Sequence, residues 1–452
     1  MPDRATQLKL AFYGDDFTGS TDALESLSLA GAHTILLLDV PDAATLARHA
    51  QAQAVGIAGH SRSMTPSSME DTLRPAFKRL KNLRAPFVHY KVCSTFDSSP
   101  KVGSIGHAIG IGLEIFDSPF VPVVVGAPAL GRYCAFGNLF ARLGTGKTGE
   151  VHRLDRHPSM SRHPVTPADE SDLRRHLARQ TDLKIGLIDV TQLSRPLEEA
   201  RAALAELVKT GHRIIFFDAL EERHLETIGH LLAPYGTPEQ PLFCAGSSGL
   251  GRALGLHWQS TGELTPPAAW TPAEAVEPLL VISGSASPVT AAQIAAAREA
   301  GFAEVALDTA SLLAGQVTHL GEPLERTVKA LRAGQSVVVH TCSGPDDPRL
   351  KVRVPSGVDT AKVLGTALGQ VARQSAGAVN LERVIIAGGD SSSYAGRAMG
   401  IQAVEMHAPF ASGAPLCRAR APSSTLDGVQ LNFKGGQVGA PDYFLAAQRG
   451  HL

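Results

Sequence analysis

Short, continuous runs of hydrophobic residues alternate along the chain with longer segments of helical period. The runs before residue 250 are LKLAFY (8–13), HTILLLDV (33–40), AVGIAG (54–59), PFVHYK (86–91), VPVVVGAP (121–128), LKIGLIDV (183–190), HRIIFFDA (212–219) and PLFCAG (241–246). Between them, SRPLEEARAALAELVKTG (194–211) repeats its apolar residues every three to four positions, as an amphipathic helix does. Runs without polar alternation are typical of strands covered on both faces, so the pattern predicts mainly parallel sheets between helices.

The alternation stops near WQSTGELTPPAAWTPAEAVE (258–277), which is rich in Pro, Thr and Ala and has no period. It restarts with PLLVISGSASPVTAAQI (278–294), AGQSVVVHTC (333–342) and LERVIIAGGDSSS (381–393). We therefore predict two α/β domains, residues 1–258 and 278–452, joined by a linker at 259–277. Within the first domain, Thr166 and Asp169 have the spacing of a capping box with Pro167 at the first helical position, which predicts a helix beginning there.

Composition narrows the classes of partner. The 452 residues include 42 Lys and Arg against 43 Asp and Glu, a net charge of −1, which disfavours binding to nucleic acid or to an anionic membrane. The five cysteines are scattered without Cys-x-x-Cys spacing, which favours a reduced, cytoplasmic protein without a structural zinc site. The segment MPDRATQLKL has no apolar signal core, and no apolar run approaches the roughly 18 residues of a membrane span.

Polar residues follow the predicted strands of the first domain, where ligands of doubly wound folds bind. Asp15 and Asp16 come directly after the first strand. One of them fits the N-cap of the next helix, but the second is left to accept hydrogen bonds from a hydroxyl-rich ligand or to take a hydroxyl proton. Arg62 follows the third strand, either as a solvated surface residue or as the bidentate partner of a carboxylate.

The fourth predicted strand runs into YKVCSTFDSSPKVGSIG (90–106), a dense polar segment with Lys91, Ser94 and Asp97. This segment fits either an ordinary Ser-rich loop or a cradle for a polyol and a carboxylate. Further on, His152, His157 and His163 lie in and beside a segment interrupted by prolines. A metal site needs ligands held on rigid elements, so we expect a structural or substrate-lining loop here and no metal site.

The second domain has two Gly- and Ser-rich turns between a strand and a helix. Small residues there let backbone N–H groups approach a phosphate at a helix N-terminus. The candidate residues, with a lysine near a later Gly-rich turn, are Ser283, Gly284, Ser285, Ser287, Gly388, Gly389, Asp390, Ser391 and Lys434. ARLGTGKTG (141–149) has a partial P-loop pattern, but the charged, proline-broken segment after it cannot form the required helix, so we set the P-loop aside.

Taken together, these segments resemble the four-carbon acid sugar kinase family. The resemblance covers nearly the whole chain and rests on GDDFTGSTD (14–22), YKVCSTFDSS (90–99), SGSAS (283–287) and AGGDSSS (387–393), with VGAPALGRY, SRHPVTP and LFCAGSSGLGRAL between them. DDFTG with CSTFDSS is the specific part. The resemblance implies an N-terminal domain that binds the sugar acid and a C-terminal domain that binds the nucleotide.

The resemblance also implies roles for single residues. The acid sugar would be held by Asp15, Asp16, Arg62, Lys91, Ser94 and Asp97, and ATP by Ser285, Gly388 to Ser391 and Gly413. We expect Asp16 to act as the base and Asp15 to anchor a sugar hydroxyl, with Arg62 or Lys91 on the substrate carboxylate. Mg²⁺ would arrive with ATP and have few protein ligands.

The activity implied is ATP-dependent phosphorylation of a hydroxyl of a four-carbon acid sugar: a 3-oxo-tetronate first, then D-threonate or D-erythronate. Ser104 stands where the 3-oxo-tetronate branch shows Asn, so a branched relative such as 3-oxo-isoapionate stays open. A non-catalytic acid-sugar sensor is the second class of function, and a homo-oligomer is compatible with either. A dehydrogenase or hydrolase ranks low, because the first strand lacks a Gly-x-Gly-x-x-Gly turn and no Gly-x-Ser-x-Gly elbow has a credible triad.

Overall fold

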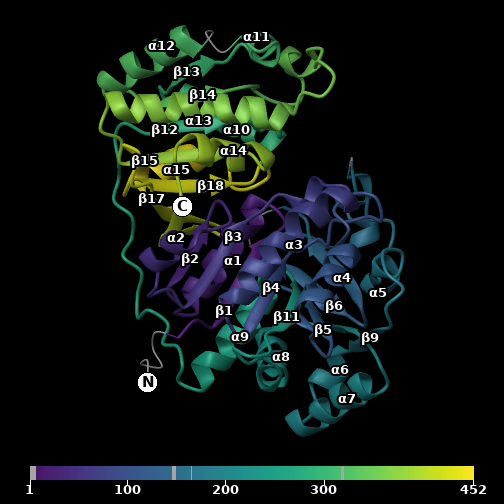
Figure 1. Ribbon diagram of the computed structural model, residues 1–452. Helices are drawn as coiled ribbons and strands as arrows, with labels where there is room; N and C mark the ends of the chain where they lie inside the picture. The colour runs from purple at the N-terminus through teal and green to yellow at the C-terminus, as the bar shows by residue number, and fades with distance from the viewer. Residues whose placement is uncertain (1–6, 145–148, 164, 317–319) are drawn as a thin grey trace. The chain divides into compact units, whose positions relative to one another are not determined.

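The computed structural model describes residues 7–144, 149–163, 165–316 and 320–452. The chain divides into two compact units. The first comprises the described residues up to Ile35 and the segment Asp39–Ala268; the second comprises Leu36–Leu38 and Ala269–Leu452. In Figure 1 the first unit runs from purple to teal and the second from green to yellow, apart from residues 36–38.

The first unit is built on a parallel sheet. Its strand order is β3-β1-β4-β11-β5-β10-β9, with β2 next to β3. The strands are β1 (Leu10–Gly14), β2 (Thr34–Leu37), β3 (Ala54–Ala58), β4 (Phe87–Lys91), β5 (Val121–Val124), β9 (Ile185–Ile188), β10 (Ile214–Phe217) and β11 (Leu242–Gly246). The second half of β2, Leu36 and Leu37, is grouped with the second unit. Most of these strands are buried along their whole length, which confirms the prediction from their continuous apolar runs.

Helices cover both faces of this sheet. On one face α3 packs against α4, and their apolar residues share a core with the strands. On the other face α1 and α8 pack against α9. The helices of the unit are α1 (Phe17–Leu29), α2 (Ala43–Arg48), α3 (Pro66–Asn82), α4 (Ile105–Phe116), α5 (Leu173–Leu177), α6 (Val190–Leu193), α7 (Leu197–Lys209), α8 (Glu222–Leu232) and α9 (Ser248–Ser260).

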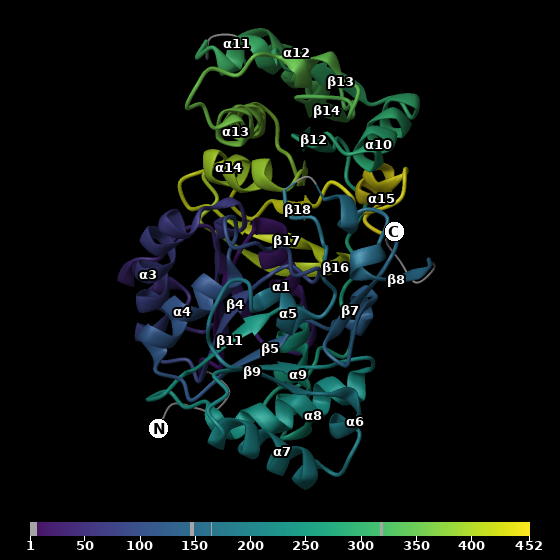
Figure 2. The same cartoon turned by 90° about the vertical axis from the view of Figure 1, so that its right-hand side faces the viewer.

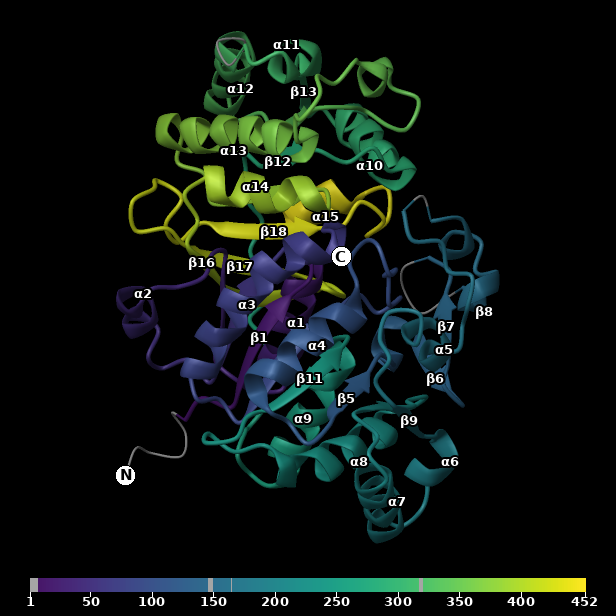
Figure 3. The same cartoon turned by 45° about the vertical axis from the view of Figure 1, so that its right-hand side comes forward.

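A second, antiparallel sheet belongs to the first unit and was not predicted. It has the order β6-β7-β8 and is formed by β6 (Arg132–Ala135), β7 (Asn138–Arg142) and β8 (Val151–Arg153). Figure 3 shows these strands grouped beside α5. Gly146, Lys147 and Thr148 of the rejected P-loop pattern lie outside the described residues, and the chain after them forms strand β8 rather than a helix.

The second unit has a mixed sheet of order β13-β14-β12-β15-β18-β17-β16. The strands are parallel from β13 to β18, whereas β17 runs antiparallel to both its neighbours. They are β12 (Leu280–Ser283), β13 (Ala303–Ala306), β14 (Val337–His340), β15 (Arg383–Ala387), β16 (Ala403–Ala411), β17 (Ala414–Arg420) and β18 (Gln430–Lys434). The antiparallel hairpin of β16 and β17 was not predicted, because the segment MHAPFASGAPLC has turn and strand residues in close succession.

Helices lie on both faces of the second sheet, with α13 and α14 on one side and α10 and α15 on the other (Figure 2). α13 and α14 approach closely because Gly365 and Gly369 leave no Cβ against the backbone of α14. The helices are α10 (Pro288–Glu299), α11 (Thr309–Leu313), α12 (Gly321–Arg332), α13 (Thr360–Ala378), α14 (Asp390–Ala398) and α15 (Tyr443–Arg449).

Two local predictions can be checked against the backbone. The helix predicted from Thr166 is wrong: the chain is irregular there, and α5 begins only at Leu173 with Asp172 as its N-cap. The segment predicted as a linker contains the last residues of α9 and then no helix or strand from 261 to 277. No helix within the described ranges is long and apolar enough to cross a membrane.

Candidate functional site

The parallel register of the first unit brings three predicted segments to one edge of the sheet. Gly14 at the end of β1 lies level with Ala58 of β3 and with Lys91 of β4. The backbone N–H of Asp15 donates to the carbonyl of Lys91 at 2.8 Å, and the N–H of Arg62 donates to the carbonyl of Asp15 at 3.0 Å. Asp15, Asp16, Arg62 and Lys91 are therefore neighbours, as the sequence predicted from their positions after strands.

Arg62 forms an ion pair with both aspartates. Its Nε and Nη2 donate to the two carboxylate oxygens of Asp15 at 3.2 and 2.9 Å, and its Nη1 lies 2.8 Å from Oδ2 of Asp16. Burial opposes the charge of Arg62, but the two carboxylates outweigh burial and hold its pKa well above the ordinary value. Arg62 thus holds together two carboxylates that would otherwise repel each other.

The two aspartates differ in exposure and in pKa. Burial raises the pKa of Asp15, whose side chain is 3 % exposed, and Arg62 only partly opposes this effect. Burial pushes the pKa of Asp16 in the same direction, but Arg62, Lys91 and hydrogen bonds outweigh it, so this pKa lies below its ordinary value. The side chain of Asp16 is 13 % exposed, which makes it the more accessible carboxylate.

Asp16 is also the N-cap of α1, so its N-cap role and its place in the charged cluster coexist. Its Oδ1 accepts from the N–H of Gly19 at 2.7 Å, and its Oδ2 accepts from the hydroxyl of Thr18 at 2.8 Å. These bonds fix the orientation of the carboxylate without using all of its lone pairs. Of the two aspartates, Asp16 is therefore the one held in place and still reachable.

Lys91 has a partner that the sequence analysis missed. Its Nζ lies 3.1 Å from Oδ2 of Asp22 on α1 and donates to the carbonyl of Val92 at 3.0 Å. Gly19 permits this approach, because a Cβ there would lie 2.5 Å from Oδ1 of Asp16 and 3.2 Å from Nζ of Lys91. The signal available in the sequence was the charge of Asp22 among the small and apolar residues of this helix, a signal that Glu25 shares.

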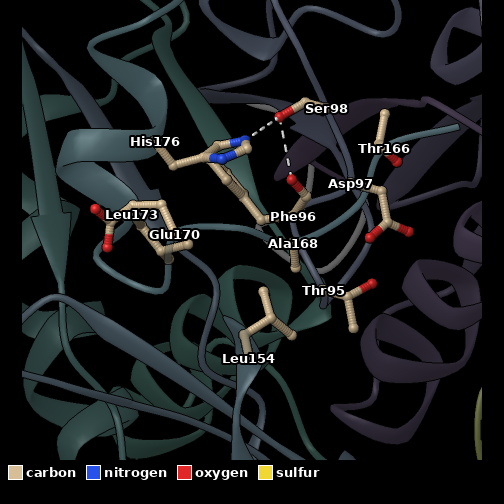
Figure 4. Close-up of a pocket in the computed structure, with 10 residues that line it drawn as sticks. All are labelled: Thr95, Phe96, Asp97, Ser98, Leu154, Thr166, Ala168, Glu170, Leu173 and His176. Carbon is tan, nitrogen blue, oxygen red and sulfur yellow. Dashed lines mark hydrogen bonds between the residues drawn. The ribbon is translucent and has the colours of Figure 1, made fainter. Parts of the chain in front are cut away.

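The loop after β4 carries the other predicted residues. Asp97 lines a small cavity with Thr95 and Ser98, shown in Figure 4, whose volume of ≈ 10 Å³ suits about one water. Within the described residues, the carboxylate of Asp97 has no hydrogen bond or ion pair. Ser94 lies in the turn at the start of this loop and is half-buried.

Ser98 anchors this loop instead of facing open space. Its hydroxyl lies 3.0 Å from Nε2 of His176, donates to the carbonyl of Phe96 and accepts from Nε2 of Gln180 at 2.9 Å (Figure 4 shows the first two). Oε1 of Gln180 in turn accepts from Ser104, the N-cap of α4. His176 and Gln180 come from the α5 region, which no local sequence signal connected with this loop.

The second unit gathers its candidate residues at one sheet edge in the same way. Register places Ser283 level with Ala387, Ala387 level with Lys434, and Leu416 level with Asn432. Because β17 is antiparallel to β18, the hairpin turn that contains Gly413 lies at the carboxyl end of β18. The Gly-rich turns after β12 and β15 thus share an edge with Gly413 and Lys434.

The turns after β12 and β15 contact each other through small residues. A Cβ at Gly284 or at Gly388 would lie 2.4 Å from Oγ of Ser391, and Gly388 has φ +146°. Ser287 caps α10 by accepting from the N–H of Val289, the hydroxyl of Ser285 accepts from the N–H of Ser287 at 3.3 Å, and Gly389 precedes α14. The side chain of Asp390 lies outside the described part of the chain.

Lys434 is fully buried, which the sequence did not indicate. Its Nζ lies 3.2 Å from the hydroxyl of Thr290 on α10 and 5.5 Å from the ring centre of Tyr443. Burial lowers the pKa of Lys434 to about 7. The amino group therefore connects β18 to the first turn of α10, next to the Ser283–Ser287 turn.

The histidine-rich segment has structural contacts. Nδ1 of His157 accepts from the N–H groups of Ser159 and Met160, and Nδ1 of His163 accepts from the N–H of Thr166. Over the residues that the structure describes, no group of three or more His, Cys, Asp or Glu side chains is arranged to hold a metal ion.

Comparison with known proteins gives a consistent assignment to both units. Residues 10–254 match the family model of the sugar-binding N-terminal domain, and residues 280–444 match that of the nucleotide-binding C-terminal domain. The chain belongs to the four-carbon acid sugar kinase family. The family supports the division of labour implied by the sequence, with the acidic edge in the sugar-binding domain and the Gly-rich edge in the nucleotide-binding domain.

Several relatives of this family are similar over nearly their whole length. A 3-oxo-isoapionate kinase from Paraburkholderia graminis is 43 % identical, with 98 % of this chain and 95 % of the relative covered. A 3-oxo-tetronate kinase from Pseudomonas savastanoi pv. phaseolicola is 31 % identical, with 97 % and 96 % covered. A crystal structure from Salmonella typhimurium LT2, described as a tRNA synthase, is 26 % identical with a TM-score of 0.76 and covers 98 % of this chain and 99 % of that one.

Proposed function

We propose that this protein is an ATP-dependent kinase that phosphorylates a hydroxyl of 3-oxo-isoapionate. The observation that carries the chemistry is Asp16: a carboxylate at a sheet edge, oriented by Gly19 and Thr18 and more accessible than Asp15. The 43 % identity to a 3-oxo-isoapionate kinase favours that substrate over the 3-oxo-tetronates, whose kinases are 28–32 % identical.

In this proposal Asp16 accepts the proton of the attacking hydroxyl as the oxygen reaches the γ-phosphorus of ATP. Asp15 acts mainly through Arg62, because its carboxylate is buried and already bonded by the guanidinium. This departs from the sequence-based expectation of a hydroxyl anchor at Asp15. Asp97, which has no ion pair with another described residue, is the better candidate for binding a sugar hydroxyl.

The nucleotide phosphates would lie at the edge formed by the turns after β12 and β15. Gly284, Gly388 and Ser391 pack so closely that a side chain at either glycine would displace the serine, leaving backbone N–H groups and hydroxyls to face a ligand. The N-termini of α10 and α14 follow these turns and favour negative charge. Mg²⁺ would neutralise charge on the transferred phosphoryl group, and it would come with ATP rather than on a protein cage.

A 3-oxo-tetronate is the second candidate substrate, favoured by four 3-oxo-tetronate kinases at 30–32 % identity over 97 to 98 % of the chain. The test is ADP release with Mg-ATP on four acids: 3-oxo-isoapionate, a 3-oxo-tetronate made in situ, D-threonate and D-erythronate. We expect the highest kcat/KM on 3-oxo-isoapionate. Higher turnover on a 3-oxo-tetronate would overturn the choice of substrate, and silence on all four would overturn the kinase proposal.

A further inference from the structure

Arg132 occupies a position at the sugar-binding edge that no candidate residue covered. It follows Gly131, whose φ of +67° closes a tight turn after β5. The N–H of Arg132 donates to the carbonyl of Ala127, and its own carbonyl accepts from the N–H of Ala127. β5 lies next to β11, and β11 lies next to β4, so Arg132 stands at the same carboxyl edge as Lys91.

The side chain of Arg132 lies on the inner face of the small sheet. Arg132 is in register with Ala141 of β7, and Cys134 is in register with Leu139. Ala141, Cys134 and Leu139 are almost fully buried in the core of the first unit. Because side chains in register share a face, Arg132 points toward that core and not to the outer side, where Arg142 lies.

Arg132 is the cation of this edge that no carboxylate neutralises. It is close enough to Asp22, Cys93 and Asp97 to interact with them electrostatically, yet it forms no ion pair with any residue in the described ranges. By contrast, Arg62 binds two aspartates and Lys91 binds Asp22. The Nη1 of Arg132 donates to three backbone carbonyls, while its Nε is buried and has no hydrogen-bond partner among the described residues.

A half-buried guanidinium with a buried, unused N–H is costly unless an anion joins it. Burial lowers the pKa of Arg132, and the nearby Cys93, Asp97 and Asp22 only partly oppose this effect. A carboxylate paired with the guanidinium would restore the balance of charge, and the planar guanidinium suits a carboxylate.

We propose that Arg132 binds the carboxylate of the acid sugar and thereby selects acids over neutral sugars. The proposal rests on the sugar-acid kinase function given above and replaces the expectation that Arg62 or Lys91 has this role. The acid sugar would then lie between Arg132 at its carboxylate end and Asp16 at the hydroxyl that reacts, with Asp97 beside it. All of these residues belong to the first unit.

The test compares three variants with the wild-type protein: Arg132→Met, Arg132→Lys and Arg142→Met. The third is a matched control, since Arg142 lies on the neighbouring strand, bonds the hydroxyl of Tyr133 and faces away from the core. Calorimetry gives the Kd of each of the four acids and, for D-threonate and D-erythronate, of their primary amides. KM for acid and for ATP are measured on the acid with the highest turnover.

We expect Arg132→Met to raise the Kd and KM of the acid by about 10- to 100-fold, the range for a lost hydrogen bond to a charged group, with KM for ATP unchanged. Arg132→Lys should recover part of the lost affinity for the acid, and Arg142→Met should change the Kd and KM of the acid less than about 2-fold. In Arg132→Met the Kd of the amides should not rise. This pattern separates recognition of the carboxylate from loss of the turn that Nη1 supports, which would weaken acid and amide alike.

The proposal would be overturned if Arg132→Met bound the acids as tightly as the wild-type protein. It would also be overturned if Arg142→Met lost as much affinity for the acids as Arg132→Met, or if Arg132→Met lost as much affinity for the amides as for the acids. If the wild-type protein binds an acid without transferring phosphate, the kinase function fails while the Kd values still decide the role of Arg132. If it binds none of the four acids, both fail.

Discussion

The carboxyl edges of the two sheets carry different kinds of polar group. In the first unit they are charged side chains, in which Arg62 pairs with Asp15 and Asp16, and Lys91 with Asp22. In the second unit they are small residues and backbone, with Gly284 and Gly388 closed around Ser391 and Lys434 buried against α10. The first edge suits a ligand that is held and deprotonated by side chains; the second suits phosphates bound by N–H groups.

The largest effect should come from changing Asp16 to Asn, which keeps the cap of α1 but removes the proton acceptor. We expect kcat to fall by roughly 10²- to 10⁴-fold, the range for a lost general base, with little change in Tm. Asp42→Asn is the control, because Asp42 caps the exposed helix α2 in the same way. A kcat close to that of the wild type would mean that Asp16 is only a helix cap.

Replacing Arg62 by Met tests whether the first edge depends on paired charges. The variant leaves two buried carboxylates without their shared cation, so we expect a loss of about 3–5 kcal/mol in the free energy of unfolding at pH 8. Burial already raises the folded-state pKa of Asp15, and without Arg62 this pKa would rise further. Stability is then lost as pH rises and regained as pH falls and the carboxylate of Asp15 binds a proton.

The measurement is urea unfolding of Arg62→Met at pH 5.5 and pH 8, beside Arg84→Met. Arg84 forms an exposed ion pair with Glu239, so Arg84→Met should lower the free energy of unfolding by at most about 1 kcal/mol at either pH. A loss in Arg62→Met that is the same at both pH values would show that packing, and not charge pairing, holds this edge together.

Gly388→Ala addresses the second edge. Its Cβ would lie 2.4 Å from Oγ of Ser391 at a backbone with φ +146°, so the turn or the serine must move. We expect KM for ATP to rise about 10-fold, with the Kd of the acid sugar unchanged. Gly357→Ala is the control: it also has positive φ, +80°, but no atom within 4 Å of the added Cβ. Weakened acid binding in Gly388→Ala would contradict the division of labour between the units.

The two edges also differ in how far the sequence predicted them. At the first edge, Asp15, Asp16, Arg62 and Lys91 could be predicted as site residues because they are charged and lie at or after the ends of apolar runs. The ends of parallel strands meet at one edge of the sheet. Asp22 and Arg132 were missed, since one sits within a helix and the other follows a turn into an unpredicted small sheet. The pairing of charges depends on distances of 3 Å that no residue pattern specifies.

At the second edge the Gly and Ser turns were visible in the sequence, but their geometry was not. That Gly284 and Gly388 close on the same Ser391 follows from strands β12 and β15 being neighbours, although about 100 residues separate them along the chain. Lys434 is buried because α10 and α15 cover it. In the sequence two glycines follow this lysine, a pattern that is more typical of an exposed turn.

Ser98→Ala should have the smallest effect and tests whether the loop beside Asp97 is part of the first edge or only next to it. The hydroxyl holds His176 and Gln180, so its loss should cost about 1 kcal/mol of stability. If the loop positions Asp97 for the sugar, KM for the acid should rise about 2- to 5-fold, in proportion to that small energy. The control, Ser63→Ala, removes an exposed hydroxyl that donates to the nearby carbonyl of His60. A stability loss in Ser98→Ala with unchanged KM would assign the loop to the fold alone and leave acid binding to Arg132 and the aspartates.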